Sequence, residues 1–208
     1  MMVFESKHPL VKIKLSILRD KKTKDKVFRE ALEEITSLLT YEALKDLETV
    51  PNGIITTPTG ANVPSLRLKD ELIALPILRA GIGMVEGVLK MLPTIKVGHI
   101  GIYRDEKTLE PHRYYYKMPS IKPAKIIILD PMIATGNSMC DAISVVKKSG
   151  YTDILVMALI GAPEGLENVT KNHPDVNIYI ASIDEGLNKH GYIMPGLGDA
   201  GDRIFGTK

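Results

Sequence analysis

Short apolar runs alternate with helical patterns over residues 71–181, and this alternation constrains the fold more than any other feature of the chain. The apolar runs are 71–76, 96–103, 125–130, 154–160 and 176–181, with helical segments at 83–92, 138–148 and 164–171. Strands that are apolar along their length are typical of a parallel sheet covered by helices on both faces. Ligands of such sheets bind beyond the carboxyl ends of the strands, so we expect functional residues in the loops that follow these runs.

The residues before this α/β core follow a different pattern. Apolar side chains recur at helical spacing up to residue 47, with a first helix starting at His8-Pro9 and Thr23 capping a second. Thr49 to Gly53 reads as a turn, and short β-prone pieces follow up to residue 68. We therefore expect one domain, 1–208, made of N-terminal helices (1–47), a β excursion (48–70), the core (71–182) and a C-terminal segment (183–208).

Composition narrows the function to a small-ligand enzyme or binder. The 208 residues are 44% hydrophobic and 25% charged, and the formal net charge is only +2. A dedicated nucleic-acid binder usually carries a larger and more clustered basic excess. The chain has one cysteine, Cys140, and no apolar run of about 18 residues that could span a membrane. We expect a cytoplasmic protein that binds neither nucleic acid nor membranes.

The most informative motif is the stretch from Ile126 to Ser138. A buried strand ends at Asp130, and a loop of small residues then carries Thr135 and Ser138 into a helix. Backbone N–H groups of such a loop converge on an anion, and the helix start adds free donors and a favourable dipole. Asp130 can accept hydrogen bonds from sugar hydroxyls. The motif favours ribose-phosphate recognition over an ordinary helix cap, in which Asp130 would merely close the strand.

The segment from Asp130 to Ser138, DPMIATGNS, resembles the donor-binding loop of the type I phosphoribosyltransferases, and more narrowly that of the uracil phosphoribosyltransferase family. Four further blocks resemble those of the family in the same order: PILRAG (76–81), YRDEKTLEP (103–111), APEG (162–165) and GYIMPGLGDAGDRIFGTK (191–208). The likeness covers essentially the whole chain. Pro131 stands where many members of the wider fold carry a second acid, which fits the uracil branch.

The resemblance implies a role for each block. Arg79, Arg104, Asp130 and Asp199 are the expected catalytic residues, with Arg79 and Arg104 holding the diphosphate of phosphoribosyl pyrophosphate (PRPP). Uracil is expected against Ile193, Gly198, Asp199 and Ala200, where glycines allow close backbone approach to a planar base. The PRPP-binding set comprises Arg79, Arg104, Asp130, Pro131, Met132, Ile133, Ala134, Thr135, Gly136, Asn137, Ser138 and Asp199.

The resemblance also implies the reaction, which converts uracil and PRPP to uridine monophosphate (UMP) and diphosphate in pyrimidine salvage. Mg²⁺ is expected on the diphosphate of PRPP without a direct side-chain ligand, and the five histidines share no metal-site spacing. Family members form homodimers or homotetramers, and GTP is a candidate effector. No side chain is singled out as a general base.

Two alternatives from other functional classes remain. One is a regulatory RNA-binding protein on the same fold, which predicts a dedicated basic face. The other is a noncatalytic sensor that binds PRPP without turning it over, which predicts a defective loop at 103–111 or a defective C-terminal segment. Both blocks are intact in this sequence.

Overall fold

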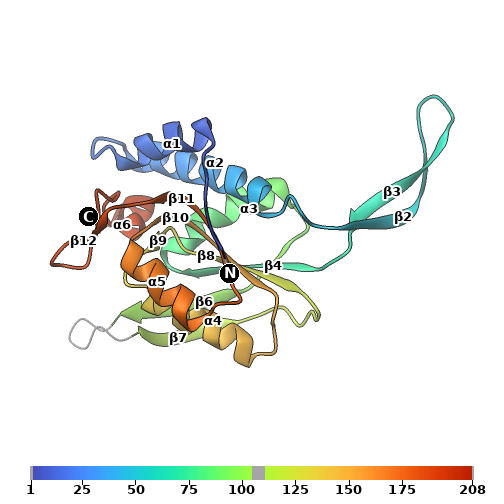
Figure 1. The fold of residues 1–208 in the computed structure, drawn as a ribbon. Coiled ribbons are helices and arrows are strands. Elements are labelled where there is room, and N and C mark those ends of the chain that lie inside the picture. Colours follow the sequence, from blue (N-terminus) through green and yellow to red (C-terminus); the bar gives the residue numbers. More distant parts are fainter. Residues whose placement is uncertain (1, 105–110, 208) are drawn as a thin grey trace.

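The computed structural model describes residues 2–104 and 111–207, and a twisted nine-stranded sheet forms its centre (Figure 1). The order along the sheet is β1-β11-β10-β8-β4-β6-β7, with β5 beside β4 and β9 beside β10. All neighbours are parallel except β6 and β7. The strands are β1 (Val3–Glu5), β4 (Leu72–Leu78), β5 (Lys96–Val97), β6 (His99–Arg104), β7 (Pro111–Lys117), β8 (Lys125–Leu129), β9 (Met132–Ile133), β10 (Ile154–Gly161) and β11 (Asn177–Ile183).

The predicted parallel sheet is confirmed, and its central strands are buried on both faces. All eight residues of β10 are buried, as are four of the five in β8. Continuous apolar sequence suits this position, because helices cover both sides of a parallel sheet. The edge strand β1 was not anticipated. It spans three residues and pairs with β11. A strand of this length is too short for an alternating pattern to be read from the sequence.

Helices form a layer on each face. One layer contains α1 (Pro9–Arg19), α2 (Asp25–Ala43), the 3₁₀ turn η1 (Ala80–Met84) with α3 (Val85–Met91), and α6 (Ala200–Phe205). The other contains α4 (Asn137–Lys148) and α5 (Pro163–Asn172). Phe28 and Leu32 of α2 are fully buried against the sheet. No helix in the described part of the chain is long and apolar enough to cross a bilayer.

The predicted start of the first helix is confirmed and that of the second is wrong. The His8 side chain accepts a hydrogen bond from the Leu10 amide, and Pro9 opens α1. Lys24, not Thr23, is the N-cap of α2. The Thr23 hydroxyl instead donates to the carbonyl of Ile17 at 2.7 Å, so it fixes the turn between the two helices.

The β excursion is a hairpin arm that projects from the body of the molecule (Figure 1). It consists of antiparallel β2 (Thr49–Thr56) and β3 (Asn62–Leu68). The predicted turn at 49–53 is wrong, because these residues belong to β2. The register shifts between Pro51 and Ile54, and Gly53 adopts a positive φ there, so the turn-like residues mark an irregularity within a strand.

Candidate active site

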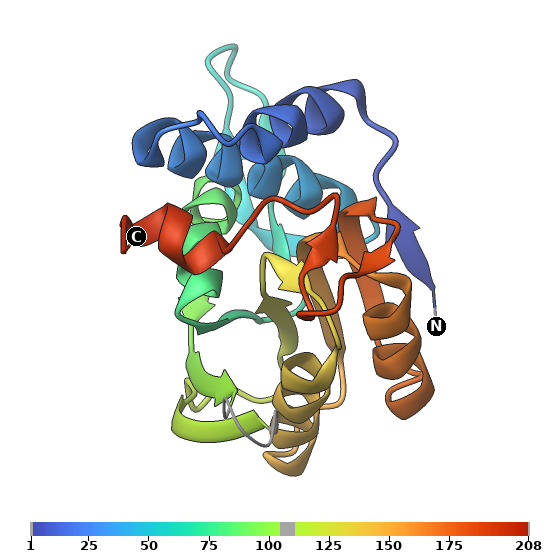
Figure 2. The same ribbon diagram turned by 90° about the vertical axis from the view of Figure 1, so that its left-hand side faces the viewer.

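The residues predicted to bind ligand follow the carboxyl ends of neighbouring strands. Arg79 follows β4, Asp130 follows β8, the 162–165 block follows β10, and the C-terminal segment returns past the end of β11 (Figure 2). Because β11, β10, β8 and β4 are parallel neighbours, their carboxyl ends share one edge of the sheet. The fold therefore brings separate sequence blocks to one place.

The loop that enters α4 packs directly on the start of α5. A Cβ on Gly136 would lie 2.5 Å from the Gly165 carbonyl oxygen, and a Cβ on Gly165 would collide with the Ala134 carbonyl. The Asn168 amide donates to the Thr135 carbonyl and to the Asn137 side chain, both at 2.8 Å. The loop conformation is thus set by α5. Glycine is required on both sides of this contact, which explains the APEG block.

The first turn of α4 is suited to bind an anion. Its N-cap, Gly136, has a φ of +78° and supplies no capping side chain, and the first turn contains no acidic residue. The free N–H groups and the dipole of this helix start therefore favour a negatively charged ligand. Residues 134–138, predicted to bind the 5′-phosphate, lead into this helix start.

Asp130 is placed between this loop and β8 in a partly buried position. One of its carboxylate oxygens accepts a hydrogen bond from the Met132 amide at 3.2 Å. Burial raises the pKa of the Asp130 carboxyl to about 7, and the Met132 hydrogen bond offsets only part of this shift. A carboxyl with a pKa near neutral at the carboxyl end of a sheet strand indicates a functional site. Hydrogen bonds from a ligand to this carboxyl would favour its charged form.

The loop after β4 approaches the same strand end. A Cβ on Gly81 would collide with the Leu129 carbonyl oxygen, so the backbone after Arg79 lies directly against the end of β8. The Leu78–Arg79 peptide bond is cis. The Arg79 side chain is 60% exposed, and its Nη2 lies 3.8 Å from a carboxylate oxygen of Asp202. Its guanidinium is solvent-accessible at the edge where the blocks meet.

The C-terminal segment reaches the Arg79 loop through α6. Asp199 is the N-cap of this helix, and its carboxylate accepts a hydrogen bond from the Asp202 amide at 2.9 Å. A Cβ on Gly201 would lie 3.3 Å from Asp199 Oδ1 and 3.9 Å from Arg79 Nη2. Ile193 and Ala200 are buried. Asp199 is therefore near Arg79, and part of its hydrogen-bonding capacity is used to cap α6.

Arg104 is the last residue of β6, where its backbone pairs with Pro111 of β7. The Arg104 side chain and residues 105–110 lie outside the described part of the chain, so the predicted contact to the diphosphate stays a prediction.

Sequence reasoning missed several residues that shape this region. Asn168 and Gly165 fix the anion loop, and a pair formed by Arg19 and Asp184 contacts the C-terminal segment. Only Gly165 had a signal, in the APEG block. Arg19 ends a helix 165 residues before Asp184, and no local pattern links them.

Comparisons with known proteins agree over the full chain. The family model for uracil phosphoribosyltransferase matches residues 5–207. Uracil phosphoribosyltransferase of Clostridium beijerinckii is 53% identical over 207 residues, covering 99% of each chain. That of Ureaplasma urealyticum is 53% identical over 203 residues, covering 97% of each chain.

Solved structures show the same architecture. A protein of Aquifex aeolicus superposes with a TM-score of 0.92 at 40% identity and 98% coverage of both chains. Adenine phosphoribosyl transferase from Trypanosoma brucei shares the fold at a TM-score of 0.57 and 13% identity, covering 88% of this chain and 83% of the other.

An acidic strand end, an anion loop at a helix start and an arginine loop, all at one edge of this sheet, define a type I phosphoribosyltransferase. The family model and the relatives match nearly every residue of the chain, and they identify one family within this class. The chain belongs to the uracil phosphoribosyltransferase family.

Proposed function

We propose that this protein transfers the phosphoribosyl group of PRPP to uracil, giving UMP and diphosphate in pyrimidine salvage. The observation that carries the proposal is the convergence of the Arg79 loop, Asp130 with its anion loop, and the 193–201 segment at one sheet edge. These three parts match the three parts of the reaction: leaving diphosphate, ribose phosphate and base.

Each part has a proposed role in the donor site. The backbone and hydroxyls of 134–138 bind the 5′-phosphate, Asp130 accepts hydrogen bonds from the ribose hydroxyls, and residues 131–133 carry the chain between them. Arg79 holds the diphosphate with parallel N–H donors, and Arg104 contributes from the end of β6. Asp199 contacts the donor beside Arg79, which the proximity of both side chains to Gly201 supports.

The base is proposed to bind along the backbone of the C-terminal segment. Uracil presents two carbonyl acceptors and one N–H donor, so alternating N–H and C=O groups at Ile193 and at Gly198 to Ala200 can match its edge without charged side chains. A neutral polar edge of this kind discriminates bases by the hydrogen bonds that a wrong base leaves unpaired.

The chemical step breaks the bond between C1 of the ribose and the diphosphate oxygen and forms a bond from C1 to N1 of uracil, whose N1 proton is released to water. Positive charge develops on the ribose and negative charge on the leaving diphosphate. Arg79 and Arg104 stabilise the departing charge, while the loop and the C-terminal segment hold the two reactants in line. No side chain is assigned as a general base.

Mg²⁺ is the proposed cofactor, carried with the diphosphate of PRPP, where it would neutralise charge on the leaving group. The donor set of the site fits this arrangement. In the described part of the chain, no three His, Cys, Asp or Glu side chains gather as a protein metal cage. Mg²⁺ usually keeps several waters and binds one or two carboxylates plus substrate phosphates. Asp199, near Arg79, is the carboxylate that we assign to the surroundings of this Mg²⁺.

The partner that we propose for the hairpin arm is a second copy of the chain. Arg67 is the only charged residue among residues 50–67, and four large apolar side chains of the arm are exposed: Ile54, Ile55, Val63 and Leu66. A lone two-stranded hairpin is at best marginally stable in water, and exposed apolar patches of this kind mark interfaces. Its lack of charge favours a neutral, apolar partner. We therefore propose a homo-oligomer built on the arm.

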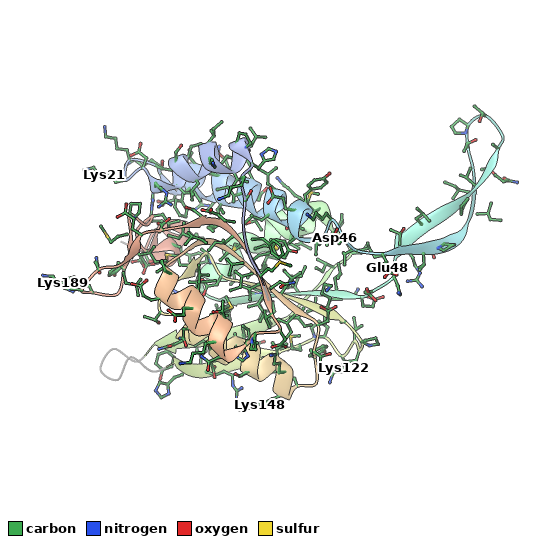
Figure 3. The ribbon with its side chains drawn as sticks, viewed as in Figure 1. Lys21, Asp46, Glu48, Lys122, Lys148 and Lys189 are labelled. Atoms are coloured by element: carbon green, nitrogen blue, oxygen red, sulfur yellow. The ribbon has the colours of Figure 1, made fainter. Side chains whose placement is uncertain are left out.

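Three further expectations carry over from the sequence. Its length and composition favour a single domain that works in the cytoplasm, and the resemblance makes GTP a candidate effector. Activity measured with and without added GTP tests the last of these. Lys21, Lys122, Lys148 and Lys189 lie at separate places around the outline of the molecule (Figure 3).

The decisive experiment offers the protein PRPP and Mg²⁺ with uracil, cytosine, orotate, hypoxanthine or adenine in separate reactions. Formation of UMP from uracil alone supports the proposal. Binding of PRPP without any product favours the sensor, and product from another base would contradict the assignment of the C-terminal segment. A gel-shift assay with RNA at ordinary salt tests the RNA-binding alternative.

A further inference from the structure

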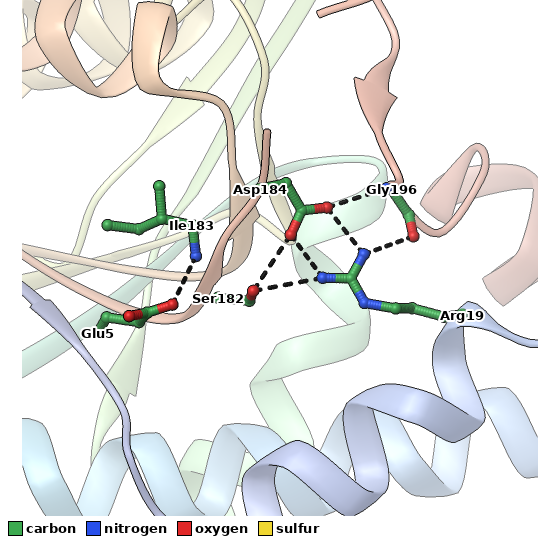
Figure 4. A network of polar contacts seen from close by, with 6 residues as sticks. All are labelled: Glu5, Arg19, Ser182, Ile183, Asp184 and Gly196. Atoms are coloured by element: carbon green, nitrogen blue, oxygen red, sulfur yellow. Dashed lines mark hydrogen bonds and ion pairs between the residues drawn. The ribbon is translucent and has the colours of Figure 1, made fainter. Parts of the chain in front are cut away.

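A buried ion pair holds the turn that lies inside the C-terminal segment. Arg19, the last residue of α1, forms two hydrogen bonds to the carboxylate of Asp184, at 2.8 Å and 2.5 Å (Figure 4). The Asp184 side chain is 1% exposed and that of Arg19 is 24% exposed. The Ser182 hydroxyl donates to the same carboxylate at 3.1 Å and accepts from Arg19 at 3.3 Å.

Both members of this pair bind the backbone of Gly196. The Gly196 amide donates to Asp184 at 2.9 Å, and the Gly196 carbonyl accepts from Arg19 at 2.7 Å (Figure 4). Gly196 has a φ of +67°, and a Cβ there would collide with the Ile193 carbonyl oxygen. The two charges therefore fix a tight turn that lies between Ile193 and Gly198.

A second arginine ties the next residue of the turn to the same helix. Arg203 donates to the carbonyl of Leu197 at 2.8 Å, to that of Leu18, and to that of Asp20 at 2.8 Å. Its guanidinium also stacks on the Phe28 ring at 4.4 Å. The end of α1 and the start of the following turn thus hold both Gly196 and Leu197.

We propose that Arg19 and Asp184 are positioning residues for the nucleobase. They set the backbone of residues 193–200, whose N–H and C=O groups then meet the edge of uracil, and this inference rests on the proposed function. A buried ion pair adds little net stability compared with apolar residues, while loss of one partner leaves an uncompensated charge. Placement of the turn, more than stability, is the role that suits a bidentate pair at this position.

The donor site does not depend on this pair in the same way. The anion loop is held by Gly165 and Asn168 of α5, and the Arg79 loop packs on the end of β8. Asp199, the donor residue that lies in the 193–200 segment, is held separately as the N-cap of α6 by its hydrogen bond from the Asp202 amide. None of these contacts involves Arg19 or Asp184. Perturbing the pair should therefore change recognition of the base and leave recognition of PRPP nearly intact.

The test is a kinetic comparison of Arg19→Lys with wild type. Lysine keeps the positive charge but cannot reproduce the planar fork that serves Asp184 and Gly196 together. We expect the KM for uracil to rise by about tenfold or more, with the KM for PRPP within about twofold of wild type. Arg29→Lys is the matched control, because Arg29 donates to the Ile204 carbonyl at 2.8 Å, in α6 and outside the turn.

A second variant covers the case in which Arg19→Lys fails to fold. Ser182→Ala removes only the hydroxyl that bridges Arg19 and Asp184, and should shift the KM for uracil in the same direction by a smaller factor. Equal increases in both KM values, or the same change in Arg29→Lys, would mean that the pair serves general stability and would overturn the proposal.

Hydrogen exchange separates this inference from the proposed function. Arg19→Lys, or Ser182→Ala in its place, should speed amide exchange in peptides that cover 193–200 and leave peptides that cover 130–138 unchanged. This readout needs no turnover, so it is decisive even if the wild-type protein fails to convert uracil. Uniformly faster exchange across the chain, or no increase in exchange at 193–200, would overturn the positioning role.

Discussion

Replacing Asp130 by asparagine should stabilise the protein while it abolishes activity. Burial raises the pKa of this carboxyl from 3.8 to about 7, so the folded chain holds the proton more tightly than the unfolded chain. The free energy of unfolding therefore falls as the pH rises from about 4 to about 7, because the buried carboxyl must ionise in the folded state. Above about pH 7 this penalty is constant. Asparagine removes this penalty, and its side-chain oxygen can still accept the Met132 hydrogen bond.

The size of the effect follows from the shift in pKa. A difference of about 3 pKa units at about 1.4 kcal/mol per unit gives a penalty near 4 kcal/mol above pH 7. At pH 5 only about 1 to 2 kcal/mol of it has developed. The advantage of Asp130→Asn should thus grow by about 3 kcal/mol between pH 5 and pH 8, which corresponds to a rise of roughly 5–10 °C in the Tm difference for a chain of this size.

The assay is thermal unfolding of the wild type and the variant without ligands, at pH 5, 6, 7 and 8 and at one protein concentration. Transfer activity, measured in parallel at pH 8, should fall by about a hundredfold or more because ribose hydroxyls lose a charged acceptor. A variant that is less stable than wild type at pH 8, or a Tm difference that does not change with pH, would refute the reasoning. Unchanged activity would remove Asp130 from the proposed donor site.

Three more variants test separate parts of the molecule. Arg79→Lys should lower kcat/KM for PRPP by about tenfold to a hundredfold with little change in Tm, since the side chain is 60% exposed. A clear drop in Tm accompanying the loss of activity would argue against a direct ligand role. Gly165→Ala should displace the anion loop through the Ala134 carbonyl and raise the KM for PRPP about tenfold or more, and a normal KM would show that α5 does not set the loop. Ile54→Asp, at a side chain 77% exposed on the arm, should shift sedimentation toward the monomer without loss of helix content by circular dichroism, and unchanged sedimentation would exclude this part of the arm from the interface.

The central strands could be predicted from sequence because burial dictates their composition. β8 and β10 contact helices on both faces, so nearly every position is apolar and the run is visible without structural information. The anion loop could be found for a related reason: an acid at the strand end and small residues at a helix start are adjacent in sequence. Local chemistry of this kind leaves a local pattern.

Other features depend on contacts between distant residues and left no such pattern. Thr23 is a residue type that often caps helices, but its hydroxyl donates to the carbonyl of Ile17, six residues earlier. Pro51 and Gly53 suggest a turn, while the pairing of Pro51 and Ile54 with β3 on either side of the irregularity keeps this stretch in a strand. The partners of Arg19 lie 165 and 177 residues further along the chain. These outcomes are set by tertiary packing, which sequence periodicity does not record.

Because Arg19 and its partners are far apart in the sequence, the ribosome synthesises them at different times. At roughly 5–20 residues per second, Arg19 is synthesised about 9 to 35 seconds before Gly196, which lies 177 positions later. During that interval β4, β8 and α4, which carry the proposed donor site, have already been made, while the turn for the base has not. The nascent chain therefore contains the strand ends and the anion loop before it contains the turn, and the contact of Arg19 with Gly196 cannot close until that turn has been synthesised.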